Sequence, residues 1–316
     1  MLLKDKYREL CKLEESIPLF SQDWWLDSVC GKDNWDVCLV EKGRKVYASM
    51  PYYIHNKKGF RFITQPPLTQ TLGPWIRHES TTESKKLENE KKLMNSLISQ
   101  IPKVDYFNQQ WNYKNTNWLP FYWQNYTQTT RYTYRIPNIS DADEIISKFD
   151  AAKRKNIKKS ENIVTIKKNI TAKEFFDNHK MTLSLQESEI SYSFETFKRI
   201  YDSAYERDSG MTIAAYDCDN NLHAALFIVW DSNSAYDLIS TIDPRFRSSG
   251  AASLLIKEAI IILSGKTKAF DFEGSMIEPV ERSFRQFGAE QTPYFMISKT
   301  NSKLLKIRNA LKEILR

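Results

Sequence analysis

Histidine and cysteine are both scarce in this chain of 316 residues, which contains four of each. The cysteines include no CxxC pair, and the few histidines cannot complete a zinc-site spacing with them. The histidines also lie far apart, with no nucleophile motif nearby, so a His-based catalytic triad has little support. We therefore expect reduced thiols, no bound metal ion and no nucleophilic catalysis of the serine-protease type.

Long apolar runs are missing as well. The longest one, 251–264, is interrupted by Lys257 and Glu258 and is shorter than the roughly 20 residues that cross a bilayer. The N-terminus becomes charged at Lys4, which leaves no room for the hydrophobic region of a signal peptide. No heptad pattern of useful length predicts a coiled-coil arm. We expect a cytoplasmic protein without a transmembrane segment.

The residues that are present describe a globular protein with a basic surface. Hydrophobic residues make up 41% and charged residues 27% of the chain, which is long enough for two ordinary domains. Lysine and arginine number 46 against 39 aspartates and glutamates, and the calculated pI is about 9.0. This excess favours an anionic partner such as a nucleotide cofactor, RNA or a lipid surface, although a mildly basic solvated surface would give the same count.

The order of the expected elements repeats along the chain. In the first half we expect helices at 3–14 and 21–26, strands at 35–41, 45–55 and 60–64, a helix at 83–101, a strand at 104–109, a helix at 118–125 and a strand at 130–136. In the second half we expect helices at 145–160, 172–185 and 194–207, strands at 163–167, 211–217, 222–230 and 235–243, a helix at 249–263, a strand at 269–272, a helix at 280–287 and a strand at 294–299. Gln, Thr and Tyr also recur at one spacing in 124–132 and 286–294. The sequence therefore predicts an α/β (α+β) chain with two tandem domains, 1–140 and 141–316, each a mixed, largely antiparallel sheet flanked by helices.

The most chemically specific segment follows the expected strand that ends at Asp243. A basic loop there leads into a helix that starts with small residues, so several unpaired backbone amides can point at one anion. Gly250 and two alanines allow a pyrophosphate to approach the backbone, while Arg245 and Arg247 add positive charge. A serine-capped helix start would look the same. The first half has no such loop, because its crossing at 65–75 is rich in proline and aromatic residues.

The pattern Arg247-x-x-Gly250-x-Ala252 at a strand-to-helix junction resembles the acyl-CoA pyrophosphate loop of the GNAT superfamily, Arg/Gln-x-x-Gly-x-Gly/Ala. A duplicated GNAT fold with one such loop resembles the Fem-type aminoacyl-tRNA-dependent peptidyltransferases and their relatives with a BioF2-like acetyltransferase domain. The segments 153–159, 270–274 and 283–288 carry this second resemblance. It implies that 1–140 is a degenerate GNAT-like domain on the acceptor side and that 141–316 binds the donor. The implied donor-binding residues are Arg245, Arg247, Ser248, Ser249, Gly250, Ala251 and Ala252.

Two residues beyond this loop are candidates for catalysis. Glu273 directly follows an expected strand, and a carboxylate there could deprotonate an acceptor amine or hydroxyl. Arg285 takes the place of a lysine in the Phe-Lys-x-x-Phe-Gly-like segment of Fem enzymes. An arginine can stabilise developing negative charge but cannot act as a proton shuttle. Glu278 and Glu281 are better explained as anionic residues that favour a helix N-terminus.

The resemblance implies an N-acyltransferase that moves an acyl group from acyl-CoA, acetyl-CoA above all, to an amine of a sugar nucleotide, an amino sugar or a peptide. The aromatic segment 111–123 and the crossing 65–75 would make the first half the acceptor side of a cleft. One alternative is a Fem-like peptidyltransferase of cell-wall precursor synthesis, whose aminoacyl-tRNA would be gripped by the basic run 153–159. Another is a non-catalytic GNAT-derived binding module, against which the intact donor loop argues. The acceptor, the donor, the general base and the oligomeric state stay open at this point.

The donor loop also suggests a substitution. Gly250→Asp would place bulk and negative charge where the phosphates bind, so we expect it to abolish donor binding. Because a helix start tolerates aspartate, we expect the fold to survive this change.

Overall fold

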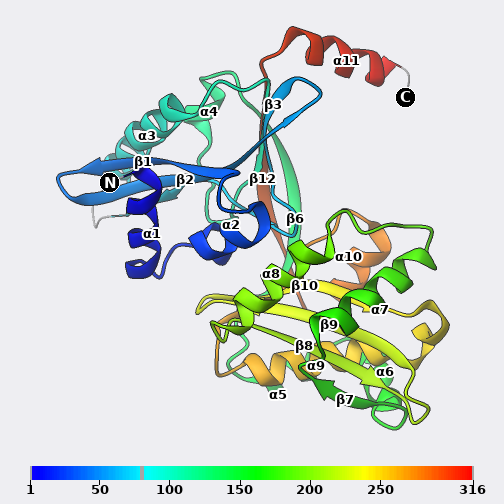
Figure 1. Ribbon diagram of the computed structural model, residues 1–316. Helices are drawn as coiled ribbons and strands as arrows, with labels where there is room; N and C mark the ends of the chain where they lie inside the picture. The colour runs from blue at the N-terminus through cyan, green and yellow to red at the C-terminus, as the bar shows by residue number, and fades with distance from the viewer. Residues whose placement is uncertain (1, 79–81, 315–316) are drawn as a thin grey trace. The chain divides into compact units, whose positions relative to one another are not determined.

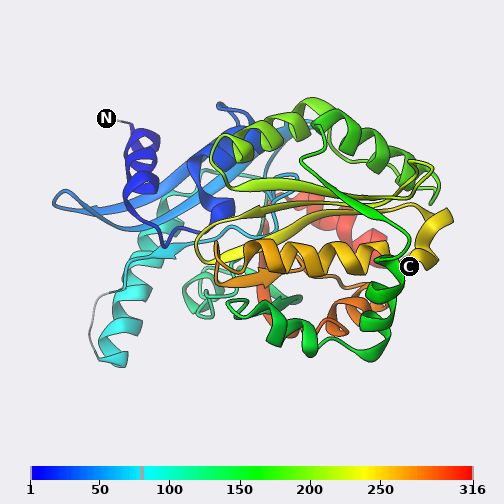
Figure 2. The same cartoon turned by 90° about the horizontal axis from the view of Figure 1, so that it is seen from below.

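The structure is a computed structural model that describes residues 2–78 and 82–314 (Figures 1 and 2). The chain divides into two compact units. Unit 1 consists of Met1–Arg131 together with Pro293–Arg316, and unit 2 consists of Tyr132–Thr292. Each unit combines a mixed sheet with helices, so the predicted α/β class is confirmed. No helix in the described ranges is both long and apolar enough to cross a bilayer.

Unit 1 contains an antiparallel meander followed by a helical crossover. Its elements are α1 (Leu3–Leu13), the 3-10 turn η1 (Leu19–Ser21), α2 (Asp23–Cys30), β1 (Trp35–Lys42), β2 (Lys45–Lys57), β3 (Phe60–Thr64), β4 (Trp75–Ile76), α3 (Glu83–Gln100), β5 (Tyr106–Gln110), α4 (Leu119–Tyr122) and α11 (Lys303–Ile314). The strand order is β1-β2-β3-β5, with β4 paired to β2. Helix α3 returns the chain so that β5 runs parallel to β3.

Unit 2 has the same plan with additional helices. Its elements are the second half of β6 (Thr127–Ile136), α5 (Ala142–Ser147), α6 (Ala151–Ser160), β7 (Thr165–Lys168), α7 (Ala172–Ser184), α8 (Phe194–Tyr205), β8 (Gly210–Tyr216), β9 (Leu222–Trp230), β10 (Ser234–Ile242), the 3-10 turn η2 (Pro244–Ser249), α9 (Ala251–Leu263), β11 (Ala269–Asp271) and α10 (Glu278–Arg285). The strand order is β6-β11-β10-β9-β8-β7. Helix α9 is the crossover here, and β11 runs parallel to β10.

The two halves of the sequence therefore fold in the same order, as predicted. Each half supplies a three-stranded meander, a crossover helix, a parallel strand, a short helix and a last strand. The last strands are exchanged, because β6 pairs with β11 in unit 2 and β12 (Glu290–Thr300) pairs with β5 in unit 1. This exchange explains why the compact units do not coincide with the segments 1–140 and 141–316, which stay a prediction about the duplicated halves.

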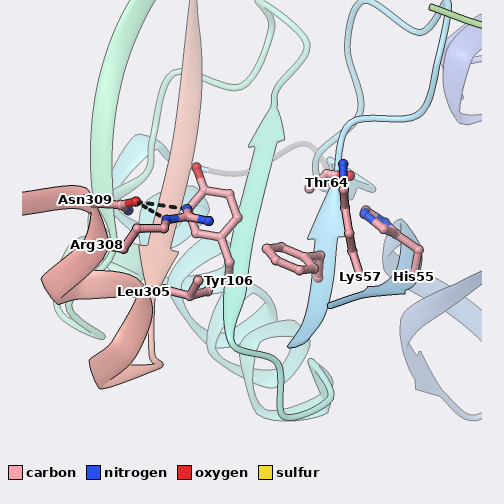
Figure 3. A pocket seen from close by; sticks show the side chains of 8 residues that line it. His55, Lys57, Thr64, Tyr106, Leu305, Arg308 and Asn309 are labelled. Atoms are coloured by element: carbon pink, nitrogen blue, oxygen red, sulfur yellow. Dashed lines mark hydrogen bonds between the residues drawn. The ribbon is translucent and has the colours of Figure 1, made fainter. Parts of the chain in front are cut away.

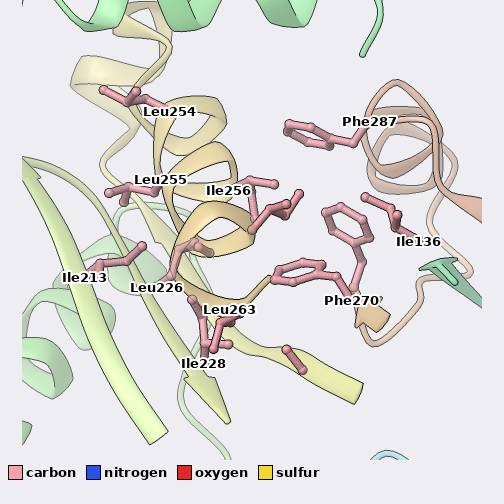
Figure 4. Close-up of a cluster of buried hydrophobic side chains, with 14 of the residues drawn as sticks. Ile136, Ile213, Leu226, Ile228, Leu254, Leu255, Ile256, Leu263, Phe270 and Phe287 are labelled. Carbon is pink, nitrogen blue, oxygen red and sulfur yellow. The ribbon is translucent and has the colours of Figure 1, made fainter. Parts of the chain in front are cut away.

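The core of unit 2 holds α9 on its sheet. Leu255 and Leu263 of α9 are buried with Ile213 of β8 and with Leu226 and Ile228 of β9 (Figure 4). Burying an aliphatic side chain of this size contributes roughly 1.5–3 kcal/mol, so this cluster fixes the helix firmly. The start of α9, where the predicted donor loop ends, is positioned by that packing.

The structure differs from the expected elements at two places. The expected helix 145–160 is broken into α5 and α6 because Phe149 turns into the core, where its ring packs edge-on against Phe287 at 5.1 Å. The amide of Asp150 donates to the carbonyl of Gln286 and starts α6 anew. Helix α11 was not expected, since the predicted elements stopped at residue 299.

Candidate functional site

The loop between β10 and α9 is built by a buried aspartate and a glycine. Asp243 accepts a hydrogen bond from the amide of Arg245 at 2.9 Å and pairs with the guanidinium of the same residue at 2.6 Å. The turn η2 follows, and Gly250 then adopts a left-handed backbone with φ 83°. A Cβ at this position would lie 2.5 Å from the backbone oxygen of Asn156 in α6. The site therefore needs glycine, and the expectation that Gly250→Asp leaves the fold intact is wrong.

A cavity of about 590 Å³ opens beside this loop, within unit 2. Five of the seven predicted donor-binding residues line it: Arg247, Ser249, Gly250, Ala251 and Ala252. The amide of Ala251 donates to the Ser249 hydroxyl, whereas the amides of Gly250 and Ala252 have no partner within the described chain. The first turn of α9 thus presents backbone donors at the cavity wall, as an anion site requires.

The other two predicted donor-binding residues lie outside the cavity wall. Arg245 is exposed and is held by Asp243. Ser248 is also exposed, and its carbonyl accepts a hydrogen bond from the Lys159 ammonium at 2.7 Å. The loop therefore offers one arginine to the cavity, Arg247, and that guanidinium has no ion pair among the described residues.

A buried carboxyl group, Asp237, lines the same cavity from β10. It is only 7% exposed, and burial raises its pKa to about 6 although the Ser240 hydroxyl, which donates to it at 2.7 Å, acts in the opposite direction. A β-bulge at this point of β10 lets two residues three positions apart face the same side of the sheet. The bulge thus places Asp237 and Ser240 together in the cavity.

Glu273, the predicted base, lies just after β11. Its backbone is left-handed with φ 60°, and its amide donates to Asp271 at 2.8 Å. Its Oε1 atom is buried and makes no hydrogen bond within the described residues. Burial raises the pKa of Glu273 well above its usual range, and the nearby carboxylates of Asp271 and Asp237 raise it further. Glu273 is coupled to Asp237 by charge but does not itself line the cavity.

The basic helix α6 is divided between two environments. Lys153 is 9% exposed and lines the cavity, where its ammonium donates to the Ser283 hydroxyl at 2.8 Å and lies 4.2 Å from the ring centre of Phe287. Burial lowers its pKa to about 8. Lys155 and Lys158 are exposed instead. The basic run therefore supplies one cation to the cavity and leaves four on the surface, since Arg154 and Lys159 are exposed as well.

The second predicted catalytic residue, Arg285, is exposed near the end of α10. Its Nε atom pairs with Glu281 at 3.0 Å, one helical turn earlier. The cavity wall on this helix is formed by Pro279, Val280, Ser283 and Phe284. The structure thus places Arg285 beside the wall rather than in it, and its role stays a prediction.

Sequence reasoning missed Asp237, His179 and Lys153, which line the cavity and carry ionisable groups. Asp237 stands among the apolar residues of 235–239, which is a usable signal because carboxylates are rarely buried without a purpose. His179 of α7 also lines the cavity; burial lowers its pKa to about 4, and its Nδ1 has no partner among the described residues. Lys153 was counted only as part of a charge run. No cluster of His, Cys, Asp or Glu that could hold a metal ion occurs in the described ranges.

No protein-family model and no curated sequence matches this chain. Solved structures do. FemX aligns with a TM-score of 0.67 at 10% identity, covering 93% of this chain and 96% of its own. The C-terminal domain (DUF2156) of a putative lysylphosphatidylglycerol synthetase from Agrobacterium fabrum aligns at 0.57 and 10% identity, covering 98% and 96%. A tandem GNAT protein from the clavulanic acid biosynthesis pathway aligns at 0.52 and 8% identity, covering 94% of each chain. At these identities the likeness is evidence about the fold.

Proposed function

We propose that this chain, which has the duplicated GNAT-like fold of the Fem type, is an N-acyltransferase that takes its acyl group from acyl-CoA, most simply acetyl-CoA. The observation that carries the proposal is the cavity in unit 2, where the start of α9, Arg247 and a buried carboxyl group meet. The proposed acceptor is an amine of a sugar nucleotide, an amino sugar or a peptide.

The donor's pyrophosphate would bind at the start of α9. The free amides of Gly250 and Ala252, the positive end of the helix dipole and the Arg247 guanidinium all favour an anion at this point. Lys153 adds a buried positive charge to the same cavity. The apolar wall formed by Phe272 and Phe284 suits the uncharged arm of the donor.

The acceptor nitrogen would attack the thioester carbonyl carbon while the carbon–sulfur bond breaks. The amine loses a proton, and the departing sulfur leaves as a thiol after gaining one. With a pKa of about 6, Asp237 is ionised at neutral pH and suits the role of proton acceptor. Glu273, the base predicted from the sequence, does not line the cavity, and the departing sulfur would take its proton from water.

Arg285 stays the candidate for stabilising negative charge on the carbonyl oxygen. Arg285→Ala is expected to lower kcat on the order of 10²–10³-fold while donor affinity stays unchanged, since its proposed contact forms only in the transition state. Steady-state rates and isothermal titration on the same variant separate the two effects. An unchanged kcat would remove Arg285 from the mechanism.

The donor assignment is tested by titrating acetyl-CoA into the wild-type protein and into Arg247→Gln. Losing one charge-assisted phosphate contact should weaken binding on the order of 10–100-fold. Lys155→Gln removes an exposed cation from the same unit and should leave acetyl-CoA affinity unchanged. Equal affinity of Arg247→Gln and wild type would show that the donor binds elsewhere.

A second candidate function is a Fem-like transferase that uses aminoacyl-tRNA. The observation in its favour is the exposed pair Lys155 and Lys158 on α6, the helix that also contacts Gly250. If the chain has this function, the double variant Lys155→Gln, Lys158→Gln should bind aminoacyl-tRNA more weakly and with a smaller salt dependence. Arg247→Gln should affect acetyl-CoA binding and leave aminoacyl-tRNA binding unchanged. Donor binding without transfer to any amine would instead indicate a binding module.

A further inference from the structure

A stripe of aliphatic side chains faces solvent on α11 of unit 1. Leu304, Ile307 and Leu311 are 67%, 60% and 55% exposed. Their spacing of three and four residues places them on one side of the helix. Exposure of more than half of three large aliphatic residues on one helix face indicates a surface that something else covers.

The orientation of α11 is fixed by its opposite side. Leu305 is buried, and it lines a hollow of about 360 Å³ together with Tyr106 of β5 (Figure 3). Arg308 and Asn309 line the same hollow from α11. The helix is therefore anchored to the sheet of unit 1 through one face, and the aliphatic stripe is its outer face.

Positive charges flank the stripe on both sides. At 100° per residue, Lys303 falls on one flank of the stripe and Arg308 on the other, and both are exposed. Lys57 lines the hollow opposite Arg308 (Figure 3). The first turn of α11 contains no acidic residue. An apolar face bordered by cations is the pattern of a helix that lies in the interface of an anionic membrane.

A second exposed cluster of the same character lies nearby in unit 1. Leu119, Tyr122 and Trp123, on and just after α4, are each roughly half exposed, and Lys91 lies 4.9 Å from the Trp123 ring. The chain after α4 and Lys306 of α11 line one shared hollow. Tryptophan and tyrosine with neighbouring lysines are typical of the headgroup region of a bilayer.

From these two clusters we infer that unit 1 carries a docking surface for an anionic lipid bilayer, formed by the outer face of α11 and the exposed end of α4. The aliphatic stripe enters the boundary between headgroups and acyl chains, Trp123 and Tyr122 lie at headgroup level, and the lysines meet the anionic headgroups. The charge of the flanks selects a lipid surface over an apolar protein partner, which needs no cationic border. The inference is independent of the donor site in unit 2.

Vesicle flotation of the full chain tests the inference. The wild type should float with vesicles of phosphatidylcholine mixed with phosphatidylglycerol, stay behind with phosphatidylcholine alone, and dissociate at high salt. Lys303→Gln with Arg308→Gln should weaken partitioning about fivefold for each cation removed. Leu304→Gln with Ile307→Gln should weaken partitioning at least about tenfold, because two aliphatic side chains that would be buried in the bilayer are replaced by polar ones.

Matched variants serve as controls for these changes. Leu185→Gln with Ile261→Gln removes two exposed aliphatic residues from unit 2, and Lys155→Gln with Lys158→Gln removes two exposed lysines there. Both should float like the wild type, and light scattering should give one mass for all variants. No binding to the anionic vesicles, or equal binding of the stripe variant and wild type, would overturn the inference. A wild-type dimer that the stripe variant converts to a monomer would overturn it in favour of a second copy of the chain.

Discussion

The two strand-to-helix crossings occupy the same place in the duplicated order, but one borders a cavity and the other is packed. The crossing after β10 in unit 2 borders a cavity of about 590 Å³. The crossing after β3 in unit 1 is filled, since four consecutive residues of it, 69–72, are buried. Trp25 donates to the Thr69 hydroxyl at 3.0 Å, and Gly73 lies so close to Trp111 that a Cβ would be 2.7 Å from its ring.

The backbone donors of the two crossings differ in the same way. In unit 1 the amide of Leu72 donates to the carbonyl of Gln110 at 2.6 Å, and the carbonyl of Leu72 accepts from Asn112 at 3.0 Å. In unit 2 the amides of Gly250 and Ala252 make no hydrogen bond within the described chain. A repeated topology therefore preserves the strand-to-helix crossing, and the local sequence decides whether that crossing borders a cavity or is filled.

The largest expected effect tests whether the chemistry belongs to unit 2. Asp237→Asn keeps the shape of the side chain and removes the proposed proton acceptor, so kcat should fall on the order of 10²–10⁴-fold. Acetyl-CoA affinity should stay within twofold of the wild type, as measured by titration. The rate is measured as thiol release from acetyl-CoA with an amino sugar or peptide acceptor that supports turnover. A variant with wild-type kcat would place the base outside β10.

Substituting the two crossing glycines sharpens the comparison. Gly250 has φ 83° and Gly73 has φ 93°, and an added Cβ would collide with Asn156 in one case and Trp111 in the other. Each change to alanine should cost on the order of 1–3 kcal/mol of unfolding free energy, measured by denaturant titration. Only Gly250→Ala should also weaken acetyl-CoA binding, because it separates α6 from the donor loop. If Gly73→Ala weakened binding equally, the crossing in unit 1 would also serve the donor.

Those parts of the structure that depend on local signals could be predicted from the sequence. The meanders, the crossover helices and the small-residue start of α9 follow from periodicity, turn residues and the Gly250 pattern. Helix α11 was missed because its aliphatic residues face solvent, so its pattern does not describe a core-facing helix. The exchange of β6 and β12 was missed because strand pairing between distant segments has no local signature.

The site was predictable only in part, for a similar reason. The part of the predicted donor loop that lines the cavity lies within one short segment, so its residues could be named from the sequence, and their role in binding a donor stays a prediction. Burial raises the pKa of Asp237. The bulge in β10 that brings Asp237 and Ser240 to one side of the sheet has no signature in the sequence. Arg245 was predicted to bind the donor because the sequence gives no sign that Asp243 pairs with its guanidinium.

The buried lysine of unit 2 gives an intermediate effect on stability. The folded pKa of Lys153 is lowered to about 8 from 10.5, so the unfolded chain binds more protons between these two pH values and stability rises with pH there. At neutral pH the buried charge costs stability, and Lys153→Met should raise the unfolding free energy on the order of 1–3 kcal/mol. The gain should shrink as pH rises from 8 toward 10.5. Lys155→Met, on the exposed side of α6, should show neither effect in the same urea titrations.

The smallest expected effect concerns the pH dependence of the reaction. Asp237 must be deprotonated to accept a proton, so kcat/KM should rise with pH through about 6, the pKa to which burial raises this group. The Ser240 hydroxyl donates to both carboxylate oxygens and favours the ionised form. Ser240→Ala removes both hydrogen bonds, so the midpoint of this limb should move to higher pH by about one unit or less. Any limb that reports the acceptor amine should stay in place, because that group does not depend on Ser240. If the lower limb of the profile has the same midpoint in both proteins, the titration of Asp237 does not control the rate. The buried carboxyl of β10 would then have no catalytic role.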